Sequence, residues 1–181
     1  MSLYDKSQVF PMVCALTAVA SFVPDDAISD RFANDLSLIY YVETKQGRVF
    51  VNADVLDQLG LAKYELLLEA LKNLQERIGK VERIGRGPTF LLRANGKDEA
   101  CLMVLDQFWE SIQNEVEGEL LVAVPAQACI LFTGSKSKTG LVALRAAVRA
   151  MAGSGDLKLS NNIYVRRQAR WHEFGDDVIV V

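Results

Sequence analysis

Residues 36–52 read LSLIYYVETKQGRVFVN. The first part of this stretch, up to Glu43, is rich in Ile, Tyr and Val, which are residue types that favour strands. Gln46-Gly47 then supplies a turn, and residues 48–52 supply a second strand-forming run. Two such runs joined by a short turn predict an antiparallel hairpin, so the chain is expected to contain antiparallel sheet.

The alternation of a hairpin with a helix continues along the chain. Further hairpins are predicted over residues 81–93, 120–133 and 163–174, and a last strand over residues 178–181. Helices are predicted over residues 54–60, 63–78, 98–116 and 139–151, the second with Leu67, Leu71, Leu74 and Ile78 on its buried face. We therefore expect an α+β fold in one domain, residues 1–181: a mainly antiparallel sheet built from hairpins that alternate with helices packed on one face.

The N-terminal apolar run, residues 9–23, has only Thr17 and Ser21 as polar members. It is shorter than the roughly 20 residues that span a bilayer. A secretory signal needs a positive leader, whereas Asp5 offsets Lys6 here and Pro11 interrupts the run. The run is interpreted as a buried helix, and residues 1–30 as a helical segment that packs on the domain.

Composition excludes some partners and favours others. The 181 residues carry a formal net charge of -3, and half of them are hydrophobic. Because phosphate backbones and anionic lipid surfaces need concentrated Lys and Arg, nucleic acid is an improbable partner and no membrane is expected. The three cysteines, Cys14, Cys101 and Cys129, are few, far apart and set among apolar residues, which indicates buried thiols in the reducing cytoplasm.

Five segments occur in a fixed order: FANDLSLIYYV (32–42), ALKNL (70–74), DEACLMVLDQFW (98–109), ELLVAVPAQACILF (119–132) and LSNNIYV (159–165), followed by Trp171. Together they resemble the YtpQ-like family of uncharacterised bacterial proteins. The resemblance implies the fold and a soluble bacterial protein, and it implies no activity, because the family has none assigned.

The chain departs from the pattern of that family at three places. Gln127 and Ala128 stand where the family has an Arg-Asp pair, and Cys101 stands where it has a serine. If the Arg-Asp pair serves an activity in the family, this chain lacks it.

No pattern of residues points to a catalytic or metal site. His172 is the single histidine, so any Ser-His or Cys-His nucleophile must use it. Cys101 lies beside Asp98 and Glu99, and carboxylates disfavour the reactive thiolate. There is no Cys-x-x-Cys, no pair of histidines and no alternating Asp loop, so the sequence predicts no catalytic residue, no metal ligand and no cofactor.

Two basic segments carry weaker hypotheses. Residues 133–140 read TGSKSKTG and lie before a predicted helix, where Lys136, Lys138 and Thr139 are a speculative anion-binding set, with Thr139 as the helix cap in the plainer interpretation. The Walker pattern is not met, because Gly140 is followed by Leu141. Residues 77–86 form a basic run that suits a solvated edge better than an RNA site.

The leading functional hypothesis is a non-enzymatic cytosolic interaction or small-ligand-binding module, which binds an unknown protein or small ligand or forms a homodimer through a sheet edge or helix face. The alternative is an enzyme that acts on a phosphorylated or anionic small molecule through the Lys136 segment.

Overall fold

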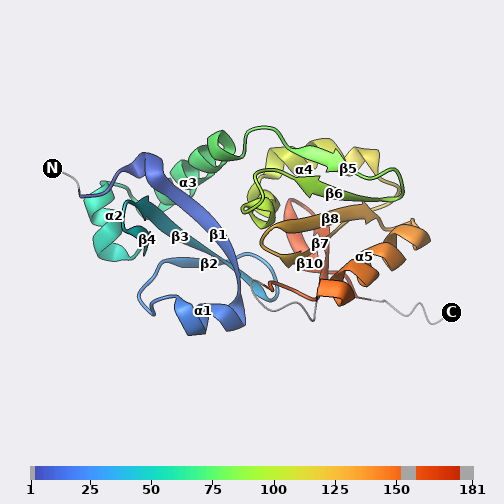
Figure 1. Ribbon diagram of the computed structural model, residues 1–181, viewed down its shortest axis with the longest axis horizontal. Helices are drawn as coiled ribbons and strands as arrows, with labels where there is room; N and C mark the ends of the chain where they lie inside the picture. The colour runs from blue at the N-terminus through green and yellow to red at the C-terminus, as the bar shows by residue number, and fades with distance from the viewer. Residues whose placement is uncertain (1–2, 152–157, 176–181) are drawn as a thin grey trace.

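The computed structural model describes residues 3–151 and 158–175, which form two antiparallel sheets with helices around them (Figure 1). The first sheet has the strand order β1-β3-β2, with β4 also paired to β3; its strands are β1 (Val9–Ala15), β2 (Ser29–Arg31), β3 (Leu36–Thr44) and β4 (Gly47–Phe50). The second has the order β10-β9-β7-β8-β6-β5; its strands are β5 (Glu82–Ile84), β6 (Thr89–Arg93), β7 (Leu120–Ala126), β8 (Cys129–Gly134), β9 (Ile163–Arg167) and β10 (Arg170–Glu173).

The helical elements lie between the strands in sequence. They are η1 (Lys6–Gln8), α1 (Leu16–Phe22), α2 (Ala53–Leu59), α3 (Lys63–Ile78), η2 (Glu99–Val104), α4 (Asp106–Ile112), η3 (Gln113–Glu115) and α5 (Lys138–Met151). The α+β class and all four predicted hairpins are confirmed. The strand predicted over residues 178–181 lies outside the described residues.

The prediction of a helix for residues 9–23 is wrong in its first half. Residues 9–15 form β1, which pairs with β3 in the register Val9↔Val42, and only Leu16–Phe22 are helical. Six of the seven β1 residues are buried, so the strand is apolar on both faces, and a continuous apolar run does not distinguish a strand from a helix. Pro11, which has no amide hydrogen, suits an edge strand better than a helix interior.

Side chains cap the outer edge of β1. The carbonyl oxygens of Val9, Pro11 and Val13 accept hydrogen bonds from three side chains: Asn73 on α3, Cys101 on η2 and Gln127 in the β7–β8 turn. These contacts replace the neighbouring strand that an edge lacks. Gln127 thus links the second sheet to the edge of the first, and Cys101 links η2 to the same edge.

The helix predicted over residues 98–116 is broken into η2, α4 and η3. Leu105 has φ -93° and ψ 84°, which ends the first segment and redirects the chain before α4. The turn brings the indole nitrogen of Trp109 to 2.6 Å from the carbonyl oxygen of Leu102. Periodicity alone did not reveal the break because the apolar spacing continues across it.

Helices cover both faces of the second sheet, where one covered face was predicted. On one face of β7, Leu121 and Ala123 pack against Leu144 and Val148 of α5. On the other, the alternate β7 residues join the large core cluster with η2 and α4.

Helix α3 has the predicted bounds but a different buried face. Its buried apolar residues are Leu66, Ala70, Leu74 and Ile78, and Leu67 is 37% exposed. The sequence offered two overlapping stripes of leucine at helical spacing, and only the packing against β1 decides between them.

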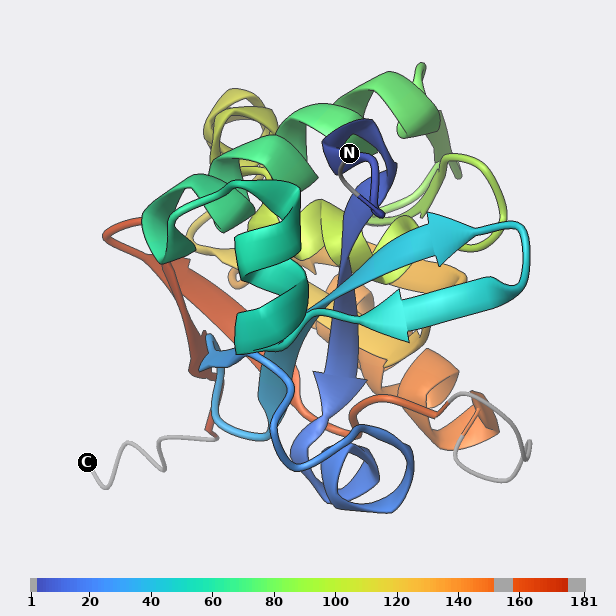
Figure 2. The ribbon, with the colours of Figure 1, turned by 90° about the vertical axis from the view of Figure 1, so that its left-hand side faces the viewer.

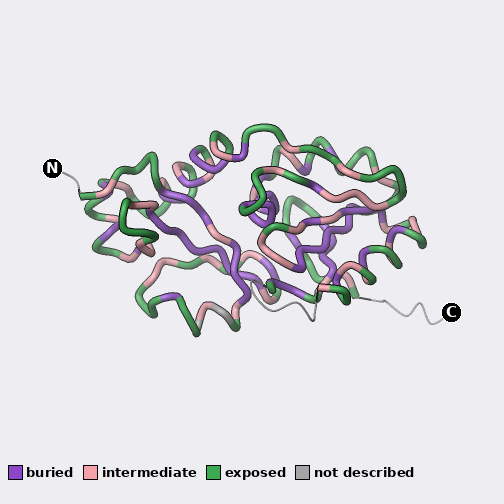
Figure 3. The backbone as a smooth tube through the Cα atoms, viewed as in Figure 1, coloured by how far each residue is buried: buried purple, intermediate pink, exposed green. Residues whose placement is uncertain are grey.

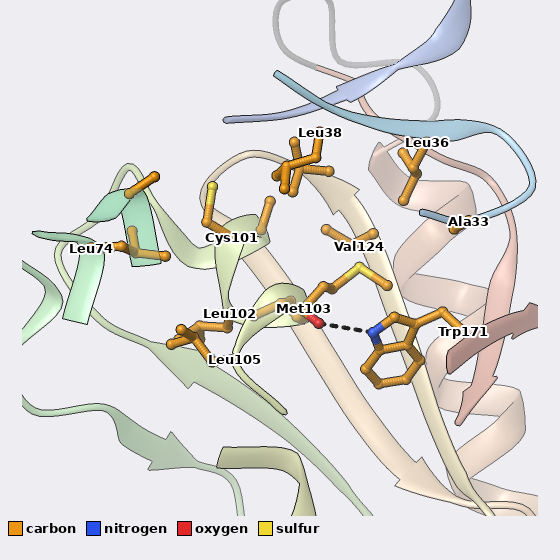
Figure 4. Packing of buried hydrophobic residues seen from close by; sticks show 14 of the residues in the cluster. Ala33, Leu36, Leu38, Leu74, Cys101, Leu102, Met103, Leu105, Val124 and Trp171 are labelled. Carbon is orange, nitrogen blue, oxygen red and sulfur yellow. Dashed lines mark hydrogen bonds between the residues drawn. The ribbon is translucent and has the colours of Figure 1, made fainter. Parts of the chain in front are cut away.

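One core cluster runs through both sheets (Figure 3). It includes Leu36 and Leu38 from the first sheet and Val124 and Trp171 from the second, with η2 between them (Figure 4). Trp171 is held at the boundary, because its indole nitrogen donates to the carbonyl oxygen of Met103 at 2.8 Å. Its ring also packs edge-on against that of Trp109, with the ring centres 5.3 Å apart.

Candidate functional site

A cleft of about 640 Å³ opens where the two sheets meet. Its walls come from β2 and β3 of the first sheet, from α3, from η2 and the start of α4, and from the β9–β10 hairpin. Figure 2 shows this side of the molecule on its left, with the red β9–β10 hairpin beside the green helix α3. The cleft therefore draws on segments that are more than 100 residues apart in the sequence.

The wall of the cleft is largely apolar. Leu67 and Leu71 of α3 form one side, and Met103 and Trp171 form another. Leu67 is 37% exposed, whereas the next residue, Leu68, is 64% exposed and does not line the cleft. Apolar side chains with partial exposure in a hollow of this size are typical of ligand sites.

The carboxylate of Asp30 is already engaged. It accepts a hydrogen bond from the Tyr40 hydroxyl at 2.9 Å, and Lys63 lies 3.9 Å away. Burial raises the pKa of Tyr40 above its ordinary value, and the hydrogen bond to Asp30 adds to that rise, so the hydroxyl stays protonated as a donor.

Asp106, the second carboxylate, is engaged by Arg166. The guanidinium of Arg166 lies 3.1 Å from the carboxylate, and its side chain is 2% exposed, whereas that of Asp106 is 60% exposed. The guanidinium also lies 5.6 Å from the centre of the Trp171 ring, and its Nε has no hydrogen-bond partner among the described residues. The buried positive charge thus depends on one carboxylate at the edge of the cleft.

Arg170 and His172 are the uncommitted groups. Both are exposed, both line the cleft, and neither side chain makes a hydrogen bond or ion pair with any residue that the structure describes. Arg31 also lines the cleft and donates from one nitrogen to the carbonyl oxygen of Asn34 at 2.7 Å, which leaves its other guanidinium hydrogens available.

The turn before Arg170 is strained. Gln168 has φ 51° and Ala169 has φ 58°, a pair of left-handed conformations that hairpin turns usually assign to Asn and Gly. Each costs roughly 1–2 kcal/mol for a side chain other than glycine. Ala169 lines the cleft, so the strain lies at its rim. Strained residues of this kind concentrate at binding sites.

The three residues predicted to bind an anion lie elsewhere, and none of them lines the cleft. Lys136, Lys138 and Thr139 are exposed at the start of α5. Ser137, and not Thr139, caps this helix, because its hydroxyl oxygen accepts the Gly140 amide at 3.1 Å. The amide of Lys136 already donates to the carbonyl oxygen of Glu117. Anion binding at this loop stays a prediction.

The other residues considered from the sequence are not brought together. Cys101 is buried, its thiol is 3.5 Å from the carbonyl oxygen of Pro11, and burial raises its pKa to about 12. It does not line the cleft, whereas His172 does. Within the basic run, Arg77 pairs with Asp98 at 2.9 Å and Arg83 pairs with Glu115 at 2.7 Å, so both charges are offset.

A second hollow, of about 800 Å³, lies beside the start of α1 and the chain before β9. Under it Asp35 accepts hydrogen bonds from the hydroxyls of Ser160, at 2.7 Å, and of Tyr164. The Tyr164 and Ser160 hydroxyls are themselves 2.7 Å apart. Because these groups satisfy one another, the network is explained as a link between the two sheets.

The sequence drew attention to His172, as the single histidine, and to Trp171, but it did not predict the cleft that both residues line. Its walls need α3, η2 and β10 in one place, and no local pattern reports that contact. The unusual turn residues Gln168-Ala169 between two predicted strands were the one local signal available, because neither is a usual residue of a two-residue hairpin turn.

The fold and the cleft define an α+β protein with a hollow between its two sheets. The wall of this hollow is largely apolar and its rim is charged. Among the described residues, no group of His, Cys, Asp and Glu is placed to hold a metal ion. Nor does any described helix have the length and apolar character needed to cross a bilayer.

Comparison with known proteins identifies distant homologues of uncharacterised function. The chain is 25% identical over 115 residues to a UPF0354 protein of Staphylococcus saprophyticus and 22% identical over 115 residues to one of Staphylococcus haemolyticus. Each match covers 62% of this chain and 40% of the relative, so the matched region spans about two fifths of the relatives' length. No family model matches the chain, and no solved structure matches it significantly.

Proposed function

We propose that the chain is a small-ligand-binding module and that its ligand occupies the cleft between the two sheets. The observation that carries the proposal is the combination of an apolar wall with the two unpartnered polar side chains of Arg170 and His172 at one hollow. A volume of about 640 Å³ falls within the range of roughly 300–1,000 Å³ that small-molecule sites occupy.

The proposal also covers the absence of catalysis, the location, the family and the oligomeric state of the protein. The module is proposed to be non-enzymatic, because the one histidine has no nucleophile or carboxylate partner among the described residues. A cytoplasmic location, membership of the YtpQ-like family and a homodimeric form are proposed with it. The order of the five shared segments supports the family assignment, and the free thiols support the location.

The test compares two adjacent leucines on one helix. Leu67→Glu places a negative charge in the cleft, whereas Leu68→Glu places the same charge beside it, at a residue that does not line the cleft. Both positions are partly exposed, so both variants should keep the fold. Native mass spectrometry of untagged protein purified from its own host measures the retained small molecule.

We expect a small molecule to copurify with the wild-type protein and with Leu68→Glu, and to be lost from Leu67→Glu. Equal retention by both variants would show that the ligand lies outside the cleft. The proposal would be refuted if the wild-type protein carried no small molecule and if host extract did not change its melting temperature.

A further inference from the structure

We infer that the ligand of the cleft is an amphipathic anion: an apolar body with one carboxylate or phosphate head group. The inference rests on the proposed function and adds the chemical class of the ligand.

The first step is the net charge that remains in the cleft once its ion pairs are taken into account. Its two carboxylates are each engaged, Asp30 by Tyr40 and Lys63, and Asp106 by Arg166. Each acid therefore has a cation beside it that offsets its charge. A cationic ligand would have to compete with these cations for the two carboxylates.

The second step is the set of cations that remain. Arg31 and Arg170 line the cleft and have no carboxylate partner among the described residues, and His172 adds a further hydrogen-bond donor. The whole chain has a net charge of -3, so this local excess of positive charge opposes the overall balance. A guanidinium presents paired donors that match the geometry of a carboxylate or phosphate.

The neighbouring acid does not cancel this excess. Glu173, at the end of β10, does not line the cleft, and its carboxylate accepts a hydrogen bond from the side chain of Asn34 at 2.6 Å. On α3, Glu69 is 3.6 Å from Lys72 and likewise does not line the cleft.

The third step is the apolar part. Leu67 and Leu71 from α3, Met103 from η2 and Trp171 from β10 supply the large apolar side chains of this part of the lining. Water against such a wall is displaced favourably by an apolar body, at roughly 25 cal/mol per Å² of apolar surface buried. The strained turn at Gln168-Ala169 sets the start of β10, which carries Arg170 to the rim beside Trp171. Arg170 and His172 alternate with Trp171 along β10, so one short strand supplies both donors and apolar surface to the lining of the cleft.

The test uses four probes with the same chain of eight carbons: octanoate, octyl phosphate, octan-1-ol and octylamine. Affinity is measured by titration of tryptophan fluorescence, because Trp171 lines the cleft and contacts Trp109. The variants are Arg170→Gln with His172→Gln, and Arg86→Gln as a matched control at an exposed arginine of another hairpin.

We expect the two anions to bind at least tenfold more tightly than the alcohol and the amine. The double variant should lose this advantage and keep the affinity for the alcohol, whereas Arg86→Gln should behave as the wild type. A stronger effect for octyl phosphate than for octanoate would assign a phosphate head group, and the reverse would assign a carboxylate.

Other outcomes would overturn the inference. Equal binding of all four probes, abolished by Leu67→Glu, leaves the cleft as a ligand site but removes the anionic class. Preference for the amine, or an anion preference that survives the double variant, refutes the role of Arg170 and His172. Absence of binding by any probe refutes an amphipathic anion, and the copurification experiment then decides separately whether the cleft holds a ligand.

Discussion

The cap that Asn73 places on the edge of β1 leads to a quantitative prediction. Asn73 is 4% exposed, and its amide nitrogen donates to the carbonyl oxygens of Lys6, at 2.8 Å, and of Val9, at 2.9 Å. Asn73→Ala removes both donors. We expect this variant to lower the free energy of unfolding, because the carbonyl oxygen of Val9 loses its side-chain donor, whereas that of Lys6 still accepts from the Val9 amide.

The magnitude follows from the surroundings of the two carbonyl groups. Lys6 is exposed, so water can replace that bond, and its loss costs about 1 kcal/mol. Val9 is fully buried, so its carbonyl oxygen stays unsatisfied at a cost of about 1–3 kcal/mol. The sum is about 2–4 kcal/mol, which lowers the melting temperature by roughly 4–16 °C for a chain of this length.

The assay is urea unfolding followed by fluorescence and by circular dichroism. Gln75→Ala is the control, because Gln75 is exposed on the same helix, and a change within about 0.5 kcal/mol is expected. Asn73→Asp keeps the size of the side chain without its donors and should destabilise at least as much as alanine. An Asn73→Asp variant as stable as the wild type would refute the reasoning, since packing and not donation would then explain the site.

Four further predictions follow from single contacts. Gln168→Asn with Ala169→Gly relieves the left-handed turn and should raise the free energy of unfolding by about 1 kcal/mol in urea titration; no gain would contradict the strain. Asp106→Ala removes the carboxylate that pairs with the buried guanidinium of Arg166 and should cost about 1–3 kcal/mol, because the pair is buried on the arginine side only, whereas the double variant with Arg166→Met should recover most of it; a double variant as unstable as the single one would refute the account. Burial raises the pKa of the Cys101 thiol from 9.0 to about 12, so the unfolded thiol ionises first and stability should fall as the pH rises from 9 towards 12. In Cys101→Ser the free energy of unfolding should fall less steeply over this pH range. An unchanged slope would show that other groups cause the fall. We propose that residues 1–181 unfold as one domain, because one core cluster joins both sheets, and fluorescence and circular dichroism should give coincident transitions; two separate transitions would show two domains.

The sequence was most informative where the signal is local. The hairpin over residues 36–52 was predicted from its turn and its β-branched residues, and β3 and β4 occupy it. Helix α3 was predicted with its observed bounds, since Gly79 ends it with φ 62°. Turn residues and helix caps act through their own neighbours, so a single sequence carries that information.

It was least informative for the candidate site. The anion-binding prediction relied on Lys136 and Lys138, which the structure leaves exposed at the start of α5, away from the cleft lining. His172 was noted as the single histidine, but its position in one cleft with Leu67 and Leu71 was not predictable. Leu67 lies about 100 residues before His172 in the sequence, and this separation does not indicate that both line one cleft.

The sequence by itself determined the class of the fold, the hairpins and the absence of a recognisable catalytic motif, because propensity, turn chemistry and composition depend on short segments. Tertiary structure alone decided that residues 9–15 are a strand, that the outer leucines of α3 face a hollow, and that two carboxylates are engaged while Arg170 and His172 are not. These outcomes depend on which apolar surfaces bury one another across long separations in the chain. The free energy of that burial is settled by the whole core and not by any one segment.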